Sequence, residues 1–385
     1  MIRIGTRGSA LALAQARLVA QAFERDGRRT RLVVVETEGD RRAPDTAWGE
    51  GAFVAAIEQA LLDRRVDVAV HSAKDVPTDD DPRLRIGAFL PRADPCDVIV
   101  VRADTPQRRL ADLPAGARVG TDSPRRMGFV LACRPDLMVH PLHGNVDTRL
   151  RRLDDGETDA LILAAAGLER LGRSERIAER LDPDVVPPAP GQGAIAVQIR
   201  CDDGRLLGLV AAIDDRSTRL RVEAERAFLA ASGGGCRAPI GALATIEGDE
   251  LLILGGYARP DGTAVARDRV RGPVGDGERL GTALAGLLGA RLPDVACQGG
   301  PVEVAPTTSG TVRRPRVIVT RAADQASDLM NHLQTAGIDA IGVPAIAIDP
   351  VAAGGELDAV ARNLAIYAWV VVTSANGAQI GRAHV

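Results

Sequence analysis

The sequence has almost no lysine. Of its 48 basic residues one is a lysine, Lys74, so the other 47 are arginines. Arginine therefore meets the need for positive charge almost everywhere, and either chance or a property that only an ammonium offers has kept Lys74. The surrounding run Val70–Pro77 (VHSAKDVP) favours the second reading. In it a buried-strand pattern leads into Lys74 and Asp75 and then a proline, which is where α/β proteins place chemistry.

Aromatic residues, overall basic charge and long apolar runs are also scarce. Aromatics make up only 2% of the residues, so stacking platforms for single-stranded nucleic acid are not expected. A net charge of −3 gives no overall basic field. Apolar runs such as Ala160–Leu168 are too short to span a bilayer, and no signal-type apolar block opens the chain. We therefore expect neither a nucleic-acid partner nor membrane association.

The five cysteines show no CxxC pair and no spacing typical of metal ligands. This pattern predicts free thiols in a reducing cytoplasm and no metal site. Cys236 stands out, because it follows three glycines and precedes Arg237, which gives an open backbone and a charge that favours the thiolate. It is a candidate nucleophile or covalent-attachment site. The remaining cysteines are interpreted as small buried hydrophobes: Cys96, Cys133, Cys201 and Cys297.

Alternating strand and helix patterns predict an α/β architecture for most of the chain. In the first predicted helix, Leu11, Ala14, Leu18 and Ala22 fall on one face and are expected to be buried. Two such α/β regions follow each other before the segment Pro187–Gly193 (PPAPGQG), which is too rich in proline and glycine for regular structure and is interpreted as a hinge.

The later part of the chain has a different pattern. A helix over Arg219–Ser232 is followed by three strand-like runs and a covering helix, which predicts a small α+β domain. Residues 299–316 have the composition of a linker. A new α/β pattern begins at Val317–Thr320.

Loops that follow predicted strands carry arginine at helix starts. The second of them is GTDSPRR, where Ser123 is a natural N-cap and Arg125 and Arg126 lie in the first turn, which the helix dipole makes unfavourable for cations. A bound anion would explain both arginines, and the alternative is that they point into solvent. Together the loops predict a carboxylate- or phosphate-binding cleft between two lobes. The three loops are Gly5–Ser9, Gly120–Arg126 and Gly144–Arg149.

Seven runs, in order along residues 1–298, carry a family resemblance. They are Gly5–Gln15, His71–Pro77, Gly120–Arg126, Gly144–Leu150, Ala165–Leu171, Pro190–Ala194 and Gly234–Gly241. Together they resemble the porphobilinogen deaminase (hydroxymethylbilane synthase) family. The resemblance implies a transferase of porphyrin and haem biosynthesis. It would join four porphobilinogen molecules head to tail with loss of ammonia, and water would then release hydroxymethylbilane.

The resemblance also implies how the chain is divided. Two lobes like those of periplasmic binding proteins would be formed by residues 1–92 with 194–214, and by 93–193. A small α+β domain at 215–298 would carry the cofactor cysteine, and the lobes would move about the hinge segment. Beyond the linker, residues 317–385 resemble the beginning of uroporphyrinogen-III synthase in the runs at 315–321, 329–343 and 369–377. We expect them to form an incomplete α/β fragment without synthase activity.

Site roles follow from the same resemblance. A dipyrromethane cofactor would be joined through a thioether to Cys236, and Asp75 would be the catalytic carboxylate, which can stabilise the cation left by loss of ammonia and handle protons. The enzyme would be a cytoplasmic monomer whose product passes to uroporphyrinogen-III synthase. The residues implied to bind cofactor or substrate are Arg7, Ser9, Gln15, Lys74, Thr121, Ser123, Arg125, Arg126, His143, Asn145, Arg149 and Arg170.

Two positions depart from the family pattern. His143 stands where the family usually has arginine, which predicts weaker binding of substrate or intermediates because a histidine is only partly protonated near neutral pH. Glu50, in the segment Thr46–Phe53 that resembles a mobile loop over the cleft, stands where lysine is common.

Two other functions fit part of the pattern. A two-lobed small-molecule-binding protein without catalysis would share the architecture, but it would need neither the Lys74–Asp75 pair nor Cys236. A Schiff-base lyase could use Lys74 as its nucleophile. It would leave Cys236 and the number of anion-binding loops unexplained.

Overall fold

The computed structural model of the chain describes residues 1–36, 54–78, 81–235 and 238–292, and three short strands further on. The chain divides into two compact units, Met1–Pro301 and Val302–Val385, each of which is described by itself. Three features singled out in the sequence lie outside the described residues: Cys236 with Arg237, the segment Thr46–Phe53 with Glu50, and Cys297.

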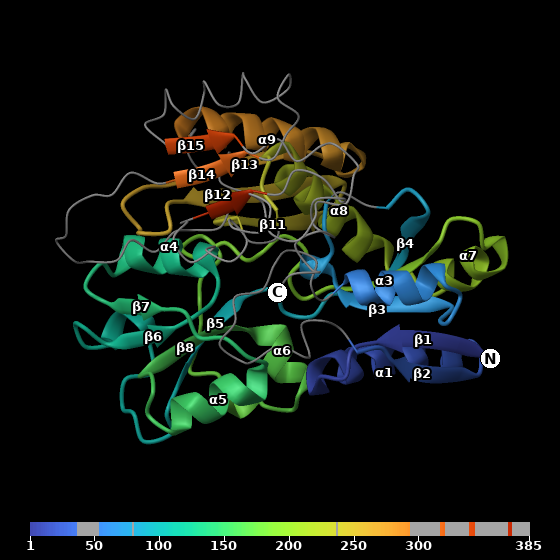
Figure 1. Cartoon of the computed structure of the whole chain (residues 1–385), viewed down its shortest axis with the longest axis horizontal. Coiled ribbons are helices and arrows are strands. Elements are labelled where there is room, and N and C mark those ends of the chain that lie inside the picture. Colours follow the sequence, from blue (N-terminus) through green and yellow to red (C-terminus); the bar gives the residue numbers. More distant parts are fainter. Residues whose placement is uncertain are drawn as a thin grey trace, which may run out of the picture. The chain divides into compact units, whose positions relative to one another are not determined.

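A mixed five-stranded sheet forms the first lobe of unit 1, in the order β2-β1-β3-β10-β4 (Figure 1). β1 runs parallel to β2 and β3, whereas β10 runs antiparallel to β3 and β4. Helices α1, α3 and α7 contact this sheet. The bounds are β1 (Ile2–Thr6), α1 (Ala10–Arg25), β2 (Thr30–Val34), α3 (Ala55–Leu62), β3 (Val68–Ser72), the 3₁₀ turn η1 (Ala73–Asp75), β4 (Leu84–Phe89), β10 (Ile195–Arg200) and α7 (Gly204–Ala211).

The second lobe repeats this arrangement with the order β7-β6-β8-β5-β9. β6 is parallel to β7 and β8, whereas β5 is antiparallel to β8 and β9. The chain crosses between the lobes twice, in residues 90–96 and 181–194. The bounds are β5 (Asp97–Val101), η2 (Leu110–Asp112), β6 (Arg118–Gly120), α4 (Pro124–Cys133), β7 (Met138–His140), α5 (Val146–Asp154), β8 (Ala160–Ala164), α6 (Ala165–Arg170), η3 (Ser174–Arg176) and β9 (Glu179–Arg180).

The buried face of α1 differs from the predicted one. Leu18 is 39% exposed, and Leu11, Ala14 and Ala22 are only partly buried. The helix instead buries the side chains one position further along, ending with Phe23, which is fully buried against the first sheet. Apolar residues surround most of this helix, so their spacing alone does not select a face, and the large aromatic ring takes the deepest position.

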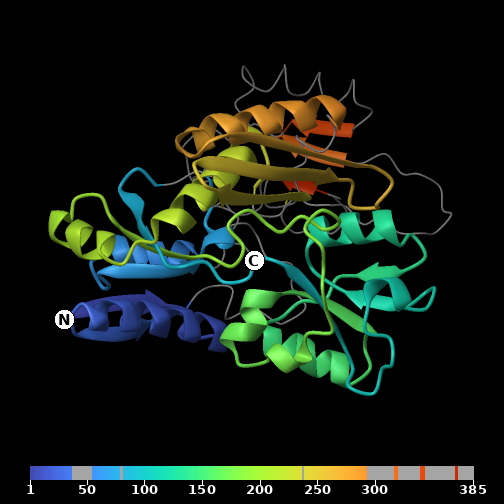
Figure 2. The ribbon, with the colours of Figure 1, turned by 180° about the vertical axis from the view of Figure 1, so that it is seen from behind.

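A small third domain completes unit 1. Its antiparallel sheet has the order β11-β12-β13 and packs against two helices, as Figures 1 and 2 show. The bounds are α8 (Arg216–Ala231), β11 (Ile240–Glu247), β12 (Glu250–Ala258), β13 (Val265–Pro273), η4 (Val274–Asp276) and α9 (Gly277–Arg291). Two α/β lobes with a small α+β domain agree with the predicted fold class.

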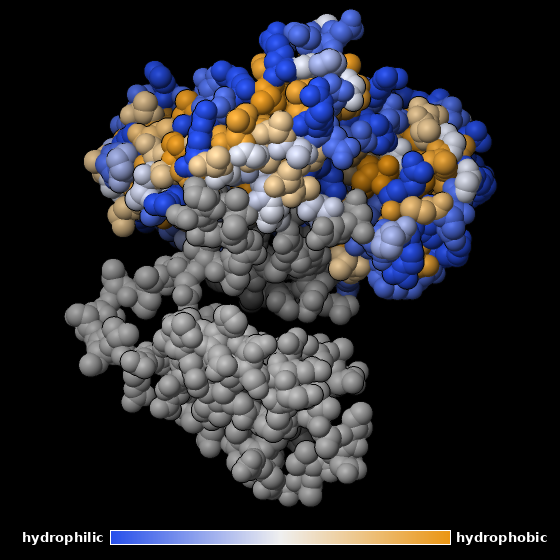
Figure 3. All heavy atoms as spheres, turned by 90° about the horizontal axis from the view of Figure 1, so that it is seen from above, coloured by the Kyte–Doolittle hydropathy of each residue, from blue (hydrophilic) through white to orange (hydrophobic). Residues whose placement is uncertain are grey.

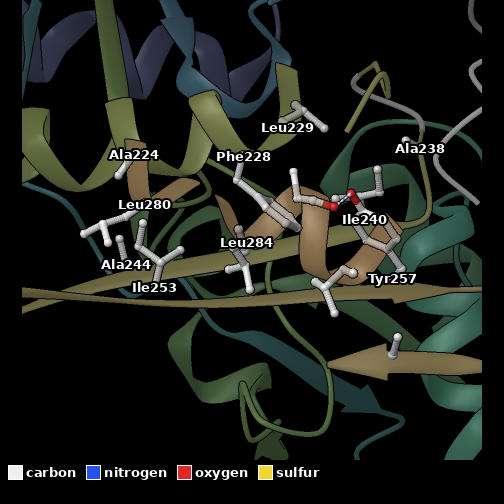
Figure 4. Close-up of a cluster of buried hydrophobic side chains, with 14 of the residues drawn as sticks. Ala224, Phe228, Leu229, Ala238, Ile240, Ala244, Ile253, Tyr257, Leu280 and Leu284 are labelled. Atoms are coloured by element: carbon white, nitrogen blue, oxygen red, sulfur yellow. Dashed lines mark hydrogen bonds between the residues drawn. The ribbon is translucent and has the colours of Figure 1, made fainter. Parts of the chain in front are cut away.

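The core of the third domain is mainly apolar, and it includes a hydrogen-bonded tyrosine (Figure 4). The rings of Phe228 and Tyr257 lie 5.7 Å apart. The Tyr257 hydroxyl donates to Oγ of Ser232 at 2.5 Å, and Ser232 in turn donates to the Phe228 carbonyl at 2.6 Å. Because Ser232 directly follows α8, this relay ties the end of the helix to β12.

We expect Tyr257→Phe to lower the free energy of unfolding by roughly 0.5–1.5 kcal/mol, because it removes a buried hydrogen bond and leaves the ring packing intact. Urea unfolding of Tyr257→Phe, Ser232→Ala and the double variant would measure this. The two substitutions should be clearly non-additive, since they remove the same contact. Additive effects would contradict the relay.

The second unit contains a parallel three-stranded sheet in the order β15-β14-β16. Its strands are β14 (Arg316–Val319), β15 (Asp339–Gly342) and β16 (Trp369–Val371). The first begins one residue before the strand predicted at Val317–Thr320. A parallel sheet agrees with the α/β pattern of this region.

The described surface seen from above in Figure 3 mixes hydrophobic residues with hydrophilic ones, which is ordinary for a globular protein. Cys133 and Cys201 are exposed, so their interpretation as buried hydrophobes was wrong; Cys133 ends α4 and Cys201 directly follows β10, and both positions face outward. Among the helices in the described ranges, none is both long enough and apolar enough to cross a membrane.

Candidate functional site

Lys74 and Asp75 lie directly after β3, a strand that is buried between β1 and β10. The Lys74 ammonium donates to Oε1 of Gln192 at 3.1 Å. The pKa of Lys74 is lowered to about 8, chiefly by burial and also by the nearby charge of Arg126, while Asp75 and Asp97 act in the opposite direction. Within the described part of the chain, no hydrogen bond or ion pair engages the half-buried carboxylate of Asp75.

Arg125 and Arg126 converge on one buried carboxylate, that of Asp97 at the start of β5. Arg125 Nη1 lies 2.6 Å from Asp97 Oδ2, and Arg126 Nε donates to Asp97 Oδ1 at 2.9 Å. All three side chains are almost fully buried. Burial by itself raises the pKa of Asp97, but the charges of the two arginines outweigh it and hold that pKa well below its usual range.

These contacts change the interpretation of the first turn of α4. Arg125 and Arg126 do not point into solvent, and the anion that they meet in the structure belongs to the chain itself. Both also donate to main-chain carbonyls, Arg125 to Pro187 at 2.5 Å and Arg126 to Ile162 at 3.0 Å. Much of their donor capacity is therefore used internally, and a role in ligand binding stays a prediction for both.

Gln192 connects this cluster to Lys74. Its amide nitrogen donates to Asp97 Oδ1 at 2.9 Å and to the Pro95 carbonyl at 2.7 Å, while its amide oxygen accepts from Lys74 and, at 3.5 Å, from Arg126. Gln192 and Pro95 lie on the two different segments that cross between the lobes. The side chain of Gln192 therefore joins both crossings to both lobes.

The glycines on either side of Gln192 hold it in place. Gly191 has φ +75° and Gly193 φ +86°, values that favour glycine. A Cβ on Gly191 would lie 3.2 Å from the backbone nitrogen of Lys74, and a Cβ on Gly193 would lie 2.5 Å from the carbonyl oxygen of Ala93. Both positions exclude larger residues, which explains the PGQG run and brings it against the Lys74 turn.

The third domain contacts the same region through a fully buried ion pair. Arg92 Nη1 lies 2.6 Å from Glu225 Oε1, and Arg92 Nε donates to the Gln192 carbonyl at 2.8 Å. Glu225, on α8, also accepts from the backbone N–H groups of Gly191 at 2.7 Å and Ala244 at 2.8 Å. The hydrogen bonds that the Glu225 carboxylate accepts therefore link the third domain to the segments that cross between the lobes.

Several predicted site residues act as helix caps in the structure. Ser9 caps α1 by accepting from the Ala12 N–H at 3.3 Å, Ser123 caps α4 from Arg126 at 3.4 Å, and Asn145 caps α5 from Thr148 at 2.9 Å. Two other predicted site residues make side-chain contacts. Gln15 Nε2 donates to Ser72 Oγ at 2.8 Å, and Thr121 Oγ1 accepts from the Ser123 N–H at 3.3 Å. These caps leave the first-turn arginines in fixed positions.

Arg149 and Arg170 are buried arginines near the same lobe. Burial lowers the pKa of each to about 10. The Nε atom of Arg149 is buried and has no hydrogen-bond partner in the described ranges, whereas Arg170 donates to the Gly193 carbonyl at 2.6 Å. A buried guanidinium nitrogen without an acceptor is costly, so Arg149 fits a site for a carboxylate ligand.

Two further predicted residues have different surroundings. His143 Nδ1 lies 2.9 Å from Asp122 Oδ1, so this side chain already faces a carboxylate of the chain. Arg7 directly follows β1, and its Nε atom is buried. No group of three or more His, Cys, Asp or Glu side chains in the described residues is arranged to hold a metal ion.

The structure thus brings Lys74, Arg125 and Arg126 together through two residues that were not among the predicted site residues, Asp97 and Gln192. Asp97 opens an otherwise apolar strand, and an aspartate before four valines and isoleucines is a signal that could have indicated a buried partner. Gln192 lies in a recognised run, where the flanking glycines were the visible feature.

This architecture defines a class of three-domain protein: two lobes built on mixed α/β sheets, a small antiparallel-sheet domain, and buried cations where the lobes meet. A family model described as "Porphobilinogen deaminase, dipyromethane cofactor binding domain" matches residues 2–208, and one described as "Porphobilinogen deaminase, C-terminal domain" matches residues 219–289. The chain belongs to the porphobilinogen deaminase family, the hydroxymethylbilane synthases of tetrapyrrole biosynthesis, which are transferases that bind a dipyrromethane cofactor.

Similar curated proteins carry the same name. Porphobilinogen deaminase of Acidothermus cellulolyticus is 48% identical over 295 residues, which cover 75% of this chain and 88% of that protein. The Mycobacterium leprae enzyme is 46% identical, over 74% of this chain and 93% of its own. A solved putative methionine-binding lipoprotein from Bacillus subtilis is 12% identical with a TM-score of 0.36, over 56% of this chain and 91% of that chain.

Proposed function

We propose that Asp75 is the catalytic carboxylate of the deaminase reaction and that Cys236 carries the dipyrromethane cofactor. The observation that supports the first assignment is the pair after β3. There Lys74 is held by Gln192, while the neighbouring carboxylate of Asp75 has no hydrogen-bond partner within the described ranges. A carboxylate kept out of the structural network is available to a reacting cation.

The residues around this pair suit a ligand that bears several carboxylates. Lys74, Arg125 and Arg126 lie near two carboxylates, those of Asp75 and Asp97. Three cations against two anions leave the cluster with surplus positive charge. Arg149 adds a guanidinium whose buried Nε has no hydrogen-bond partner among the described residues. We propose that Lys74, Arg149 and Arg170, with the helix starts at Ser9, Ser123 and Asn145, hold the acetate and propionate groups of cofactor and substrate. When bound, the cofactor supplies the pyrrole carbon to which the first substrate is joined.

Asp75 would act on the substrate at two moments. When the C–N bond of the porphobilinogen aminomethyl group breaks and ammonia leaves, a cationic pyrrole remains, and the carboxylate stabilises this charge. After the new C–C bond forms, the pyrrole ring carbon that has gained the new substituent must lose its proton. Asp75 can accept this proton and pass it on. Lys74 keeps its charge for binding and takes no covalent part, in contrast to a Schiff-base lyase.

Intact mass spectrometry tests the proposal. The purified chain, 40.4 kDa by sequence, should be heavier by one dipyrromethane, and Cys236→Ser should have the unmodified mass. The chain has a single lysine, so borohydride reduction in the presence of a carbonyl substrate such as a 2-oxo acid should add no mass at Lys74. A wild-type chain that stays unmodified in the presence of porphobilinogen would support a binding protein, and a borohydride-trapped adduct on Lys74 would support the lyase.

We further propose that the enzyme is a cytoplasmic monomer, that its product is passed to a uroporphyrinogen-III synthase, and that its domains are residues 1–92 with 194–214, 93–193 and 215–298. Residues 317–385 are proposed to derive from the beginning of such a synthase. The parallel sheet of unit 2 supports an α/β fragment there. Size-exclusion chromatography with light scattering tests the oligomeric state.

His143→Arg should lower KM for porphobilinogen severalfold at neutral pH. A guanidinium carries a permanent charge and can bind a ligand carboxylate bidentately, which an imidazole cannot do. Because His143 faces Asp122, the new arginine would have an anchoring carboxylate in place. Steady-state kinetics would measure this, and unchanged kinetics would contradict the idea that the histidine weakens binding.

A further inference from the structure

We propose that Gln192 is a positioning residue that holds the Lys74 ammonium at the junction of the two lobes and keeps it charged for ligand carboxylates. The last clause rests on the proposed binding role of Lys74. Gln192 itself need not touch a ligand. Its amide oxygen is the hydrogen-bond acceptor of the Lys74 ammonium, and its amide nitrogen is anchored on Asp97 and Pro95.

The amide can do this because its orientation is fixed. Asp97 Oδ1 and the Pro95 carbonyl oxygen are both acceptors, so they require the NH₂ end of Gln192. The oxygen end must then face Lys74 and Arg126, which are both donors. Hydrogen-bonding groups from the two lobes and both crossing segments therefore all favour the same orientation of the Gln192 amide.

The backbone reinforces this placement. The glycines flanking Gln192 fit closely against the Lys74 turn and against Ala93, and Arg92 Nε donates to the Gln192 carbonyl. Gln192 is almost fully buried, so its position depends on these packed neighbours. A glutamine with a purely structural role would need only the contacts to Asp97 and Pro95. The hydrogen bond to Lys74 is an additional contact.

The charges that face Lys74 make an acceptor necessary. Arg126 and Arg125 disfavour a further positive charge, while Asp75 and Asp97 favour it, and burial disfavours it most. Asp97 is already engaged by both arginines. The lone pair of the Gln192 oxygen is therefore a contact that specifically stabilises the charged form of the amine. With the pKa of Lys74 lowered to about 8, a small further loss would leave much of it neutral at physiological pH.

The single lysine allows a direct measurement. Full-length protein grown with ¹³C,¹⁵N-lysine should give one Lys Cε signal, whose shift follows the protonation of Lys74. We expect Gln192→Met, which keeps the side-chain length and removes the acceptor, to lower the proton affinity of Lys74 about tenfold. In the same variant KM for porphobilinogen should rise more than kcat falls, and most strongly above pH 7.

Gln192→Glu keeps an acceptor oxygen toward Lys74. Its second oxygen meets Asp97 Oδ1 and the Pro95 carbonyl, which are both acceptors, so this oxygen carries a proton and replaces the amide donor. The proton affinity of Lys74 should therefore stay close to that of the wild type. Gln198→Met is the matched control. Gln198 is also a buried glutamine, but it contacts His71 and Glu58, so Lys74 should titrate as in the wild type.

The outcomes separate the inference from the proposed function. A lowered proton affinity of Lys74 in Gln192→Met, with no change in Gln192→Glu or Gln198→Met, supports the inference. Titration of Lys74 at the wild-type pH in Gln192→Met would overturn it, as would an equal loss of proton affinity in Gln192→Glu. If the titration shifts while KM stays constant over the same pH range, Gln192 positions Lys74 as inferred, and the binding role assigned to Lys74 is what fails.

Discussion

Replacing Asp75 by asparagine is expected to lower kcat by roughly 100- to 10,000-fold, the range typical for loss of a group that transfers protons and faces developing charge. The amide keeps the size of the side chain but provides neither the negative charge nor a proton acceptor. Since no hydrogen bond or ion pair engages the carboxylate within the described residues, the substitution should leave the fold intact. Single-turnover kinetics with the cofactor-loaded variant would isolate the chemical step.

Cofactor loading and stability must be measured beside the rate. Asp136→Asn is a suitable control, because this aspartate pairs with Arg134 at the surface of the second lobe and lies in none of the motif runs. It should retain wild-type kcat. If Asp75→Asn is folded and loaded yet turns over at the parental rate, the catalytic role fails. If it loses the cofactor mass, the carboxylate acts earlier, in cofactor assembly.

Local rules predicted the helix starts well. Ser123 and Pro124 indicated a helix beginning, and α4 begins at Pro124 with Ser123 as its cap. Asn145 did the same for α5. In these places the residues that determine the structure lie within four positions of each other, so a sequence pattern contains the whole cause. The loops predicted to bind anions were located for this reason.

Strand β10 illustrates what the pattern could not reveal. Its polar residues Gln198 and Arg200 are buried, which obscures the apolar signature of a central strand. Most of their partners lie more than a hundred residues away. Gln198 contacts His71, and Arg200 donates to the carbonyls of Leu61 and Val66 as well as to nearby Asp203. Such a strand becomes recognisable only when the fold has assembled those partners.

The candidate site shows the same division. The loops with Lys74 and Arg126 were found from their motifs, but the buried acceptor that brings them together was not. Asp97 is the first residue of β5, and the whole of β6 lies between it and Arg125 and Arg126 in the sequence. No short sequence pattern marks Asp97 as their partner. Pairing across that distance is a property of the sheet order β6-β8-β5 rather than of any short run.

The second large expected effect concerns stability and the carboxylate of Asp97. Asp97→Asn should lower the free energy of unfolding by roughly 3–5 kcal/mol near pH 7, because it leaves two buried guanidinium groups without their counter-charge. Asp159→Asn is the control: Asp159 pairs with Arg118 in a partly exposed position, where the loss should be about 0–1 kcal/mol. Urea unfolding monitored by circular dichroism would measure both.

The pH dependence of that difference follows from the lowered pKa of Asp97. The charged carboxylate is favoured in the folded state, so its contribution is fully present above the ordinary aspartate pKa of about 3.9 and is lost as the pH falls below it. The asparagine side chain of the variant does not titrate in this range. The gap between wild type and Asp97→Asn should therefore stay constant from pH 7 to 5 and narrow below pH 4. A gap that is small at pH 7, or constant into acid, would show that Asp97 is not the charge that holds Arg125 and Arg126 in place.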